Sequence, residues 1–116
     1  MLGRLMDLLH GPAVRVEGTD RLPEGESRTV AVGDPLAGGT AFVLCRLGGK
    51  LYAVDVRCPH ENGRITAGPL VGGRYVMCPL HNYKFDPRNG AAVGAVCGKA
   101  RTYRVREGRG DCRVWV

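Results

Sequence analysis

The chain has 116 residues, of which 18 are glycine and 7 are proline, and its formal net charge is +6. This length predicts one domain, and so much glycine and proline excludes a helical bundle. The positive residues form no Lys/Arg run and are not interleaved with aromatic side chains, so we expect no nucleic-acid binding. An acidic protein partner fits the charge better, although a basic surface without a partner would give the same count.

The N-terminal residues give no sign of export. Met1 to Leu9 is too short and too charged to be the apolar core of a secretory leader, and no run of about 20 apolar residues predicts a membrane span. We therefore expect a cytoplasmic protein whose five cysteines are reduced. Spaced cysteines in that compartment indicate metal binding more often than disulfides.

The chain divides at about residue 12. Residues 1–12 are expected to form an N-terminal extension or a short helix, because Leu2, Leu5 and Leu9 recur at helical spacing. From residue 13 onward, short β-branched and apolar runs alternate with turn residues. Strands are predicted at 13–16, 29–33, 40–47, 50–56, 70–71, 74–77, 83–85, 102–106 and 112–116. Residues 13–116 are therefore predicted to be one domain.

Glycine pairs make two of the hairpins specific. Gly48-Gly49 separates 40–47 from 50–56, and Gly72-Gly73 folds the chain back in the same way. Short strands joined by tight turns, with almost no helix, predict an all-β fold that is an antiparallel β-sandwich or barrel.

Two pairs of cysteine and histidine flank the second hairpin. Cys58 and His60 precede it, Cys78 and His81 follow it, and His10 is the only other histidine. Two thiolates and two imidazoles suit a structural Zn²⁺ ion. They equally suit a [2Fe-2S] cluster in which one iron takes two cysteines and the other takes two histidines. We predict that these four residues are metal ligands and that His10 is not.

The order of the ligands favours the cluster. Each loop supplies one cysteine and one histidine, whereas a Cys₂His₂ zinc finger places both cysteines in one loop and both histidines on a helix. No helix is predicted after His81. A zinc-stapled structural or interaction module remains the alternative of another class.

The motif Cys58-x-His60 followed by Cys78-x-x-His81, with Phe85-Asp86 behind it, resembles the signature of Rieske iron–sulfur proteins. The resemblance implies a Rieske-like sandwich with a small cluster-binding subdomain at about residues 57–90. It implies one Rieske-type [2Fe-2S] cluster and no catalytic residue, so the chain would be an electron carrier or a non-catalytic subunit of an oxidoreductase. Its partner would be a reductase or the large subunit of an oxidoreductase.

High-potential Rieske proteins also carry an additional cysteine in each ligand loop and a serine soon after the second histidine. This chain has neither, because Asn82 and Tyr83 follow His81. We expect a low-potential, ferredoxin-like centre in the lower part of the range of roughly −150 to +300 mV.

A narrower resemblance concerns the residues around the second ligand pair. Pro79 to Tyr83, together with Cys97, is similar to the small subunit of assimilatory NAD(P)H nitrite reductases. Such a subunit would transfer electrons or chiefly aid assembly. The alternative is the ferredoxin component of an oxygenase system.

Charge and the remaining cysteines complete the predictions. Cys45 and Cys112 are expected to be small buried residues. Cys97 is expected to be structural, to have a redox or partner-contact role, or to be bonded to Cys112 in oxidised protein. Tyr83 is expected to pack near the site. A docking face for an acidic partner is predicted around the ligands, because five basic residues there oppose two acidic ones, Arg57, Arg64, Arg74, Lys84 and Arg88 against Glu61 and Asp86.

Overall fold

The structure, a computed structural model, describes residues 13–33 and 39–116. The described part contains nine strands and short 3₁₀ turns, which confirms the all-β prediction. The strands are β1 (Val14–Glu17), β2 (Ser27–Val32), β3 (Thr40–Leu47), β4 (Lys50–Asp55), β5 (Thr66–Val71), β6 (Tyr75–Cys78), β7 (Tyr83–Phe85), β8 (Thr102–Glu107) and β9 (Asp111–Trp115); the turns are η1 (Thr19–Arg21) and η3 (Val93–Ala95). The expected N-terminal extension or helix at 1–12 lies outside the described residues.

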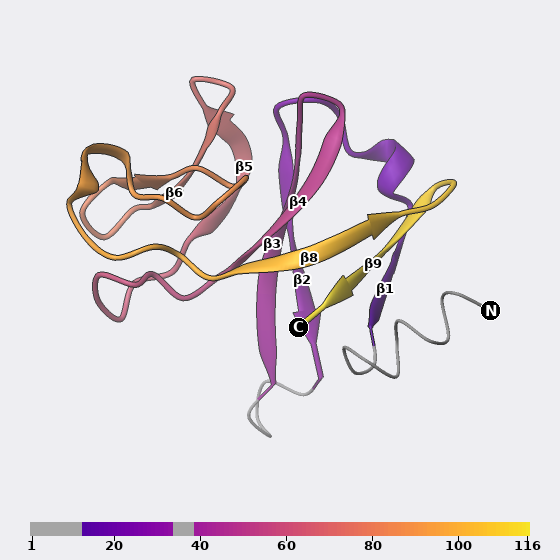
Figure 1. Ribbon diagram of the computed structural model, residues 1–116, viewed down its shortest axis with the longest axis horizontal. Helices are drawn as coiled ribbons and strands as arrows, with labels where there is room; N and C mark the ends of the chain where they lie inside the picture. The colour runs from indigo at the N-terminus through magenta and orange to yellow at the C-terminus, as the bar shows by residue number, and fades with distance from the viewer. Residues whose placement is uncertain (1–12, 34–38) are drawn as a thin grey trace.

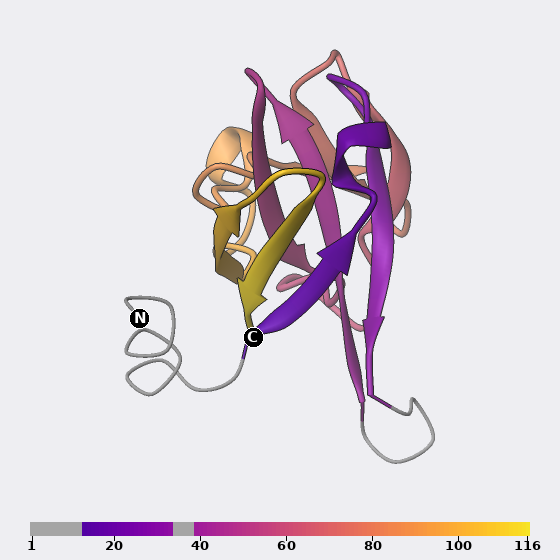
Figure 2. The same cartoon turned by 90° about the vertical axis from the view of Figure 1, so that its right-hand side faces the viewer.

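Two antiparallel sheets form the fold. The larger has the order β1-β9-β8-β4-β3-β2, and the smaller has the order β5-β6-β7. Figure 1 shows the small sheet and its loops at one end of the molecule, with β1 and β9 at the other, and Figure 2 views the molecule from the end with β1 and β9. The sheets join where β5 runs beside β2, because the Leu70 amide donates to the Gly25 carbonyl at 2.8 Å and the Ser27 hydroxyl to the Gly68 carbonyl at 2.7 Å.

The strand β3, which lies between β4 and β2, is apolar in its middle, where both of its faces are buried. Phe42 and Leu44 lie on one face and Val43 and Cys45 on the other, and all four are 0% exposed. A strand covered on both sides needs no polar alternation. The large sheet therefore has a core on each side, and the core with Val43 also contains Cys58 and Cys78.

Both predicted glycine hairpins are confirmed. Gly48 and Gly49 have φ of 63° and 77°, and Gly72 and Gly73 have 61° and 72°. Two successive left-handed residues match the twist of the flanking strands. The second hairpin is longer than predicted, since β5 begins at Thr66 instead of residue 70. Its register shifts between Thr66 and Val71, and this irregularity hid the strand from its sequence pattern.

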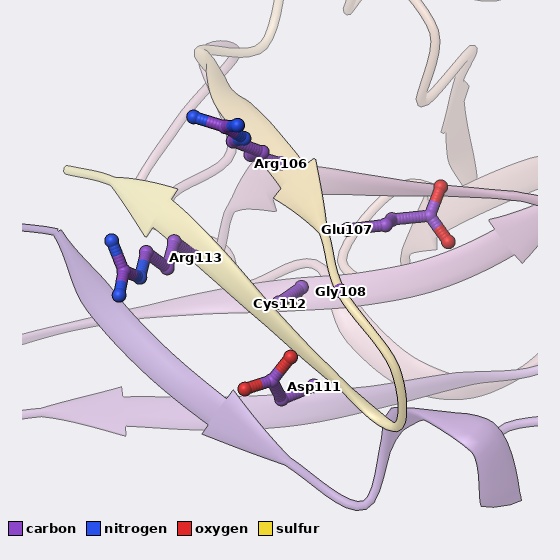
Figure 3. A pocket seen from close by; sticks show the side chains of 6 residues that line it. All are labelled: Arg106, Glu107, Gly108, Asp111, Cys112 and Arg113. Carbon is purple, nitrogen blue, oxygen red and sulfur yellow. The ribbon is translucent and has the colours of Figure 1, made fainter. Parts of the chain in front are cut away.

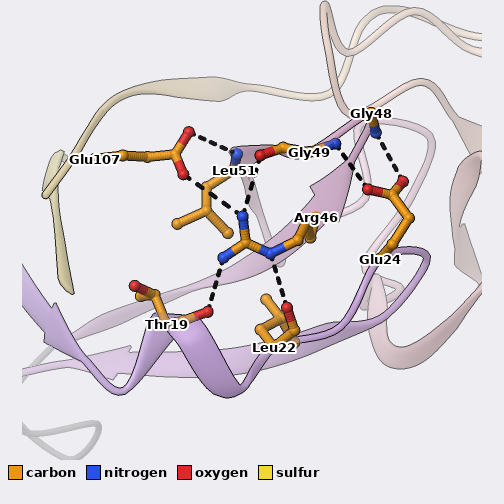
Figure 4. A network of polar contacts seen from close by, with 8 residues as sticks. All are labelled: Thr19, Leu22, Glu24, Arg46, Gly48, Gly49, Leu51 and Glu107. Atoms are coloured by element: carbon orange, nitrogen blue, oxygen red, sulfur yellow. Dashed lines mark hydrogen bonds and ion pairs between the residues drawn. The ribbon is translucent and has the colours of Figure 1, made fainter. Parts of the chain in front are cut away.

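Arg46 fixes the first hairpin to the segment before β2. Its guanidinium donates to the carbonyls of Leu22 at 2.7 Å, Thr19 at 2.8 Å and Gly49 at 3.1 Å. It also forms an ion pair with Glu107 at 3.6 Å (Figure 4). One arginine thus links three segments that are distant in sequence at the end of the sheet opposite the predicted ligands. Among the described residues, no helix is long and apolar enough to cross a membrane.

Candidate metal centre

The structure brings the four predicted ligands together on two loops beside the small sheet. Cys58 and His60 lie in the loop between β4 and β5, and this loop closes on itself where the Cys58 amide donates to the Gly63 carbonyl at 3.1 Å. Cys78 ends β6, and His81 lies in the short connection to β7. The β6–β7 ladder pairs Cys78 with Tyr83, so the backbone on both sides of His81 is fixed.

The two cysteines form the inner half of the site. Cys58 is 7% and Cys78 1% exposed, and their thiols lie beside each other. Burial raises the pKa of the Cys78 thiol and contact with Cys58 raises it further, whereas the Leu80 amide opposes this by donating to the sulfur. A metal that binds this pair as thiolates must therefore displace protons. The loops leave no gap here, since a Cβ on Gly63 would lie 2.5 Å from the Cys78 sulfur.

The two histidines form the outer half. Their ring centroids are 4.9 Å apart with an interplanar angle of 77°. His81 is exposed, and the side chain of His60 is 24% exposed. Two imidazoles this close can bind one metal ion, and a buried pair of sulfurs can bind a second. The donor set therefore fits a two-iron centre with sulfur ligands inside and nitrogen ligands outside.

Two neighbours of the histidines were not predicted from sequence in these positions. The ring of Tyr83 lies 4.4 Å from that of His60 and 5.9 Å from that of His81. The Glu61 carboxylate lies 4.0 Å from His60 Nε2. Its place next to His60 in the sequence was the only signal for Glu61. For Tyr83, the spacing from His81 suggested packing near the site but not contact with both rings.

The predicted basic surroundings are partly neutralised. Arg57 forms an ion pair with Asp55 at 2.9 Å, and Arg88 forms one with Asp86 at 2.8 Å. The five basic and two acidic residues were counted from residue 57 onward, so Asp55 was left out. With Asp55 included, five minus three gives a local charge of +2.

The other cysteines lie on different sides of the large sheet. Cys45 is 0% and Cys112 1% exposed, as predicted for small buried residues. Cys97 packs against the core that contains Cys58, whereas Cys112 belongs to the opposite core. All five cysteines are free. The sheet between Cys97 and Cys112 rules out the disulfide between them in this fold.

A cavity of about 330 Å³ lies on the β8–β9 hairpin, away from the four ligands. Figure 3 shows Arg106 and Arg113 on one side of this hairpin and Glu107 on the other. None of the four predicted ligands lines this cavity, so we do not assign it a part in the chemistry of the metal centre.

Comparison with known proteins gives one family. The model of the Rieske [2Fe-2S] domain matches residues 13–104. The ferredoxin component of a naphthalene 1,2-dioxygenase system from Pseudomonas aeruginosa is 35% identical over 86 residues, which cover 73% of this chain and 77% of that protein. A 3-phenylpropionate/cinnamic acid dioxygenase ferredoxin subunit from Photorhabdus laumondii is 36% identical over 74 residues, covering 64% and 65%.

Solved structures agree on the fold. The ferredoxin of carbazole 1,9a-dioxygenase from Nocardioides aromaticivorans superposes with a TM-score of 0.73 at 27% identity, covering 90% of this chain and 97% of that one. A structure described as an NADH-dependent nitrite reductase small subunit from Mycobacterium tuberculosis gives a TM-score of 0.61 at 22% identity, covering 89% and 95%. At that identity the second likeness concerns the fold alone.

Proposed function

Because this chain belongs to the Rieske [2Fe-2S] domain family, we propose that Cys58, His60, Cys78 and His81 hold its one [2Fe-2S] cluster. The chain is a Rieske ferredoxin-type electron-transfer protein. The observation that supports the ligand assignment is the buried thiol pair behind an imidazole pair 4.9 Å apart. We take residues 57–90 as the cluster-binding unit within the domain 13–116.

The cluster, when bound, supplies a one-electron redox centre. The chain determines how readily an electron enters. Neutral imidazoles add no negative charge, so the potential lies above that of a four-cysteine cluster. The Leu80 amide donates to the Cys78 sulfur, which also favours the reduced state. The loops carry no further cysteine and no serine follows His81 directly, so we expect the potential to lie in the lower part of the Rieske range.

Metal content and spectroscopy test this proposal. The purified protein is expected to hold two iron and two sulfide per chain and to give a rhombic electron paramagnetic resonance signal after anaerobic reduction. Replacing one ligand of each half, Cys78→Ser and His81→Leu, should remove most of the cluster because each iron loses a ligand. Cys97→Ser is the control and should keep it. One zinc per chain with no signal on reduction would refute the proposal.

We propose an oxygenase system as the destination of the electrons. The named sequence relatives, 35% and 36% identical, are ferredoxin components of dioxygenases. A nitrite reductase is the second candidate, favoured by Cys97 and by Asn82, whose φ of 55° places it in the left-handed region directly after His81. Stopped-flow oxidation of the reduced protein by each type of partner distinguishes the two destinations.

The edge formed by His60 and His81 is the proposed contact with the partner. The flanking segments carry exposed apolar side chains, at 52% for Leu80, 42% for Val93 and 51% for Val96. Figure 1 shows these segments, the β6–β7 connection and η3, at the same end of the molecule. The docking surface therefore combines apolar contacts with a modest positive charge. We retain the proposal that the partner presents acidic groups to it.

Docking of this kind predicts a partial dependence on salt. Electron transfer to the oxygenase component of a naphthalene 1,2-dioxygenase system should slow when salt is raised from about 50 mM to about 500 mM, because screening shortens the reach of charges. Leu80→Glu should slow transfer at every salt concentration by removing an apolar contact. Val116→Glu introduces the same charge at the C-terminal residue, outside the proposed docking surface, and should have little effect. A rate indifferent to both salt and Leu80→Glu would contradict this surface.

The cytoplasm is the proposed compartment. Five free cysteines support it, because thiols persist in a reducing environment.

A further inference from the structure

Tyr83 contacts both imidazoles of the site. Its ring centroid is 4.4 Å from that of His60 at an interplanar angle of 44°, and 5.9 Å from that of His81 at 45°. The three rings therefore form one aromatic cluster, in which the tyrosine is a shared neighbour of the two histidines. Rings at these separations attract each other beyond what the area that they bury contributes.

The backbone of Tyr83 is held more firmly than those of the histidines. Tyr83 is the first residue of β7 and pairs with Cys78 in the ladder. Its half-buried side chain packs against the core that contains Cys58 and Cys78. His60 and His81 lie in loops instead. The tyrosine is thus fixed to the same framework that positions the sulfur ligands.

The imidazoles have little else to orient them. Across 13–33 and 39–116, neither ring is hydrogen-bonded to another side chain or to the backbone, and the Glu61 carboxylate lies 4.0 Å from His60 Nε2. A histidine ligand is usually oriented by a hydrogen bond from its second ring nitrogen. In this chain the ring of Tyr83 is instead the group that contacts both imidazoles.

We infer that Tyr83 is a positioning residue whose ring fixes the orientation of His60 and His81 as metal ligands. This inference rests on the ligand assignment proposed above. The contact is made by the ring, and no hydrogen bond of the Tyr83 hydroxyl occurs within the described residues. Phenylalanine should therefore replace tyrosine without loss, whereas an aliphatic side chain should let the imidazoles rotate and admit water.

The test compares Tyr83→Phe and Tyr83→Leu with Tyr75→Leu in the cluster-loaded protein. Tyr75 is the control because it is a half-buried tyrosine of the same small sheet, on β6. Tyr83→Leu should broaden the electron paramagnetic resonance lines of the reduced protein and speed cluster loss by about three- to tenfold, the usual worth of an aromatic pair. Tyr83→Phe and Tyr75→Leu should retain the line shape of the unmodified protein. If Tyr83→Leu does not fold, Tyr83→Met serves, because the flexible methionine side chain fills irregular space without a ring.

The outcomes separate this inference from the proposal beneath it. If the unmodified protein shows no Rieske signal, both the proposed function and the inference are refuted. A normal signal in the unmodified protein with an unchanged signal and lifetime in Tyr83→Leu refutes the positioning role alone. Equal broadening in Tyr83→Leu and Tyr75→Leu also refutes it, because the effect would then come from general loosening of the small sheet.

Discussion

Gly90→Ala is expected to unfold at much lower denaturant than the unmodified protein and to lose most of its iron. Gly90 follows β7 in the turn that begins at Asp86, and its φ of 79° lies in the left-handed region. A Cβ at this position would also collide with the backbone carbonyl of Ala100. The left-handed conformation alone costs alanine about 1–2 kcal/mol. The collision adds to this because a backbone atom cannot turn aside as a side chain can, and we expect a total above about 3 kcal/mol.

The close approach of Gly90 and Ala100 supports the chain segment that packs behind the metal centre. The Gly90 amide donates to the Asp86 carbonyl at 2.6 Å, and the Ala100 amide donates to the Gly90 carbonyl at 2.8 Å. These bonds close the segment 91–99, which holds Cys97 against the core of the ligand cysteines. Displacing Ala100 therefore loosens the support behind the thiol pair, and cluster retention should fall together with stability.

Two other glycines distinguish the cost of the left-handed conformation from the cost of the collision with the Ala100 carbonyl. Gly72 has φ of 61° but nothing within 4 Å of a Cβ, and Gly98 has neither a positive φ nor a neighbour. Gly72→Ala should cost about 1 kcal/mol, and Gly98→Ala should change stability by less than about 0.5 kcal/mol. The measurements are the denaturant midpoint under nitrogen and the iron content per chain. A midpoint for Gly90→Ala equal to that for Gly72→Ala would contradict this prediction, because it would show that the Ala100 carbonyl moves aside without a cost in stability.

Local patterns in the sequence predicted most of the fold. The β-branched run at 40–47 and the two Gly-Gly turns each determine a strand or hairpin within a few residues, so those predictions are confirmed. The order of one cysteine and one histidine per loop also predicted that these four residues lie together, since a hairpin between the pairs brings them together. The family match then favours the cluster over zinc. Periodicity failed where the register is irregular, as in β5 around Gly68.

Contacts between distant segments could not be predicted in the same way. Arg46 donates to carbonyls more than twenty residues away, and Tyr103 on β8 donates to Asp55 on the neighbouring strand β4, 48 residues earlier in the chain. Neither pairing leaves a spacing in the sequence, because β8 joins β4 only after the whole small sheet has intervened. The neutralisation of Arg57 was missed for a different reason, because its partner Asp55 lies two residues before the start of the charge count. Side-chain partners depend on the sheet order, which a local pattern does not contain.

Asp55→Asn is expected to destabilise the protein by about 2–4 kcal/mol at pH 7. Asp55 is 2% exposed at the end of β4, three residues before Cys58. Its carboxylate accepts hydrogen bonds from the Tyr103 hydroxyl at 2.5 Å, from the Arg57 amide at 2.8 Å and from the Arg57 guanidinium at 2.9 Å. An asparagine keeps one acceptor but turns an NH₂ group toward one of these donors, so at least one buried bond is lost.

Asp86→Asn is a matched control. Asp86 and Arg88 repeat the Asp-x-Arg arrangement of Asp55 and Arg57, with the Arg88 amide donating to the carboxylate at 2.9 Å. The Asp86 side chain is 15% exposed, against 2% for Asp55, and it has no tyrosine partner among the described residues. Its replacement should cost about 1 kcal/mol. An equal loss for both variants would show that the Tyr103 bond and deeper burial of Asp55 add nothing.

The effect of Asp55 should also depend on pH in a defined direction. Burial raises the pKa of Asp55, but the hydrogen bonds from Arg57 and Tyr103 outweigh it and hold the pKa below its ordinary value. The unfolded chain, with an aspartate pKa of about 3.9, therefore takes up the proton first as the pH falls. The stabilisation is complete above that value and is lost as the pH drops through the folded pKa. The gap in denaturant midpoint between the unmodified protein and Asp55→Asn, followed by tryptophan fluorescence, should thus be constant above about pH 5 and shrink below about pH 4. A gap that widens in acid would mean that Asp55 is protonated in the folded protein, and the ion pair with Arg57 could not then be what anchors the first ligand loop.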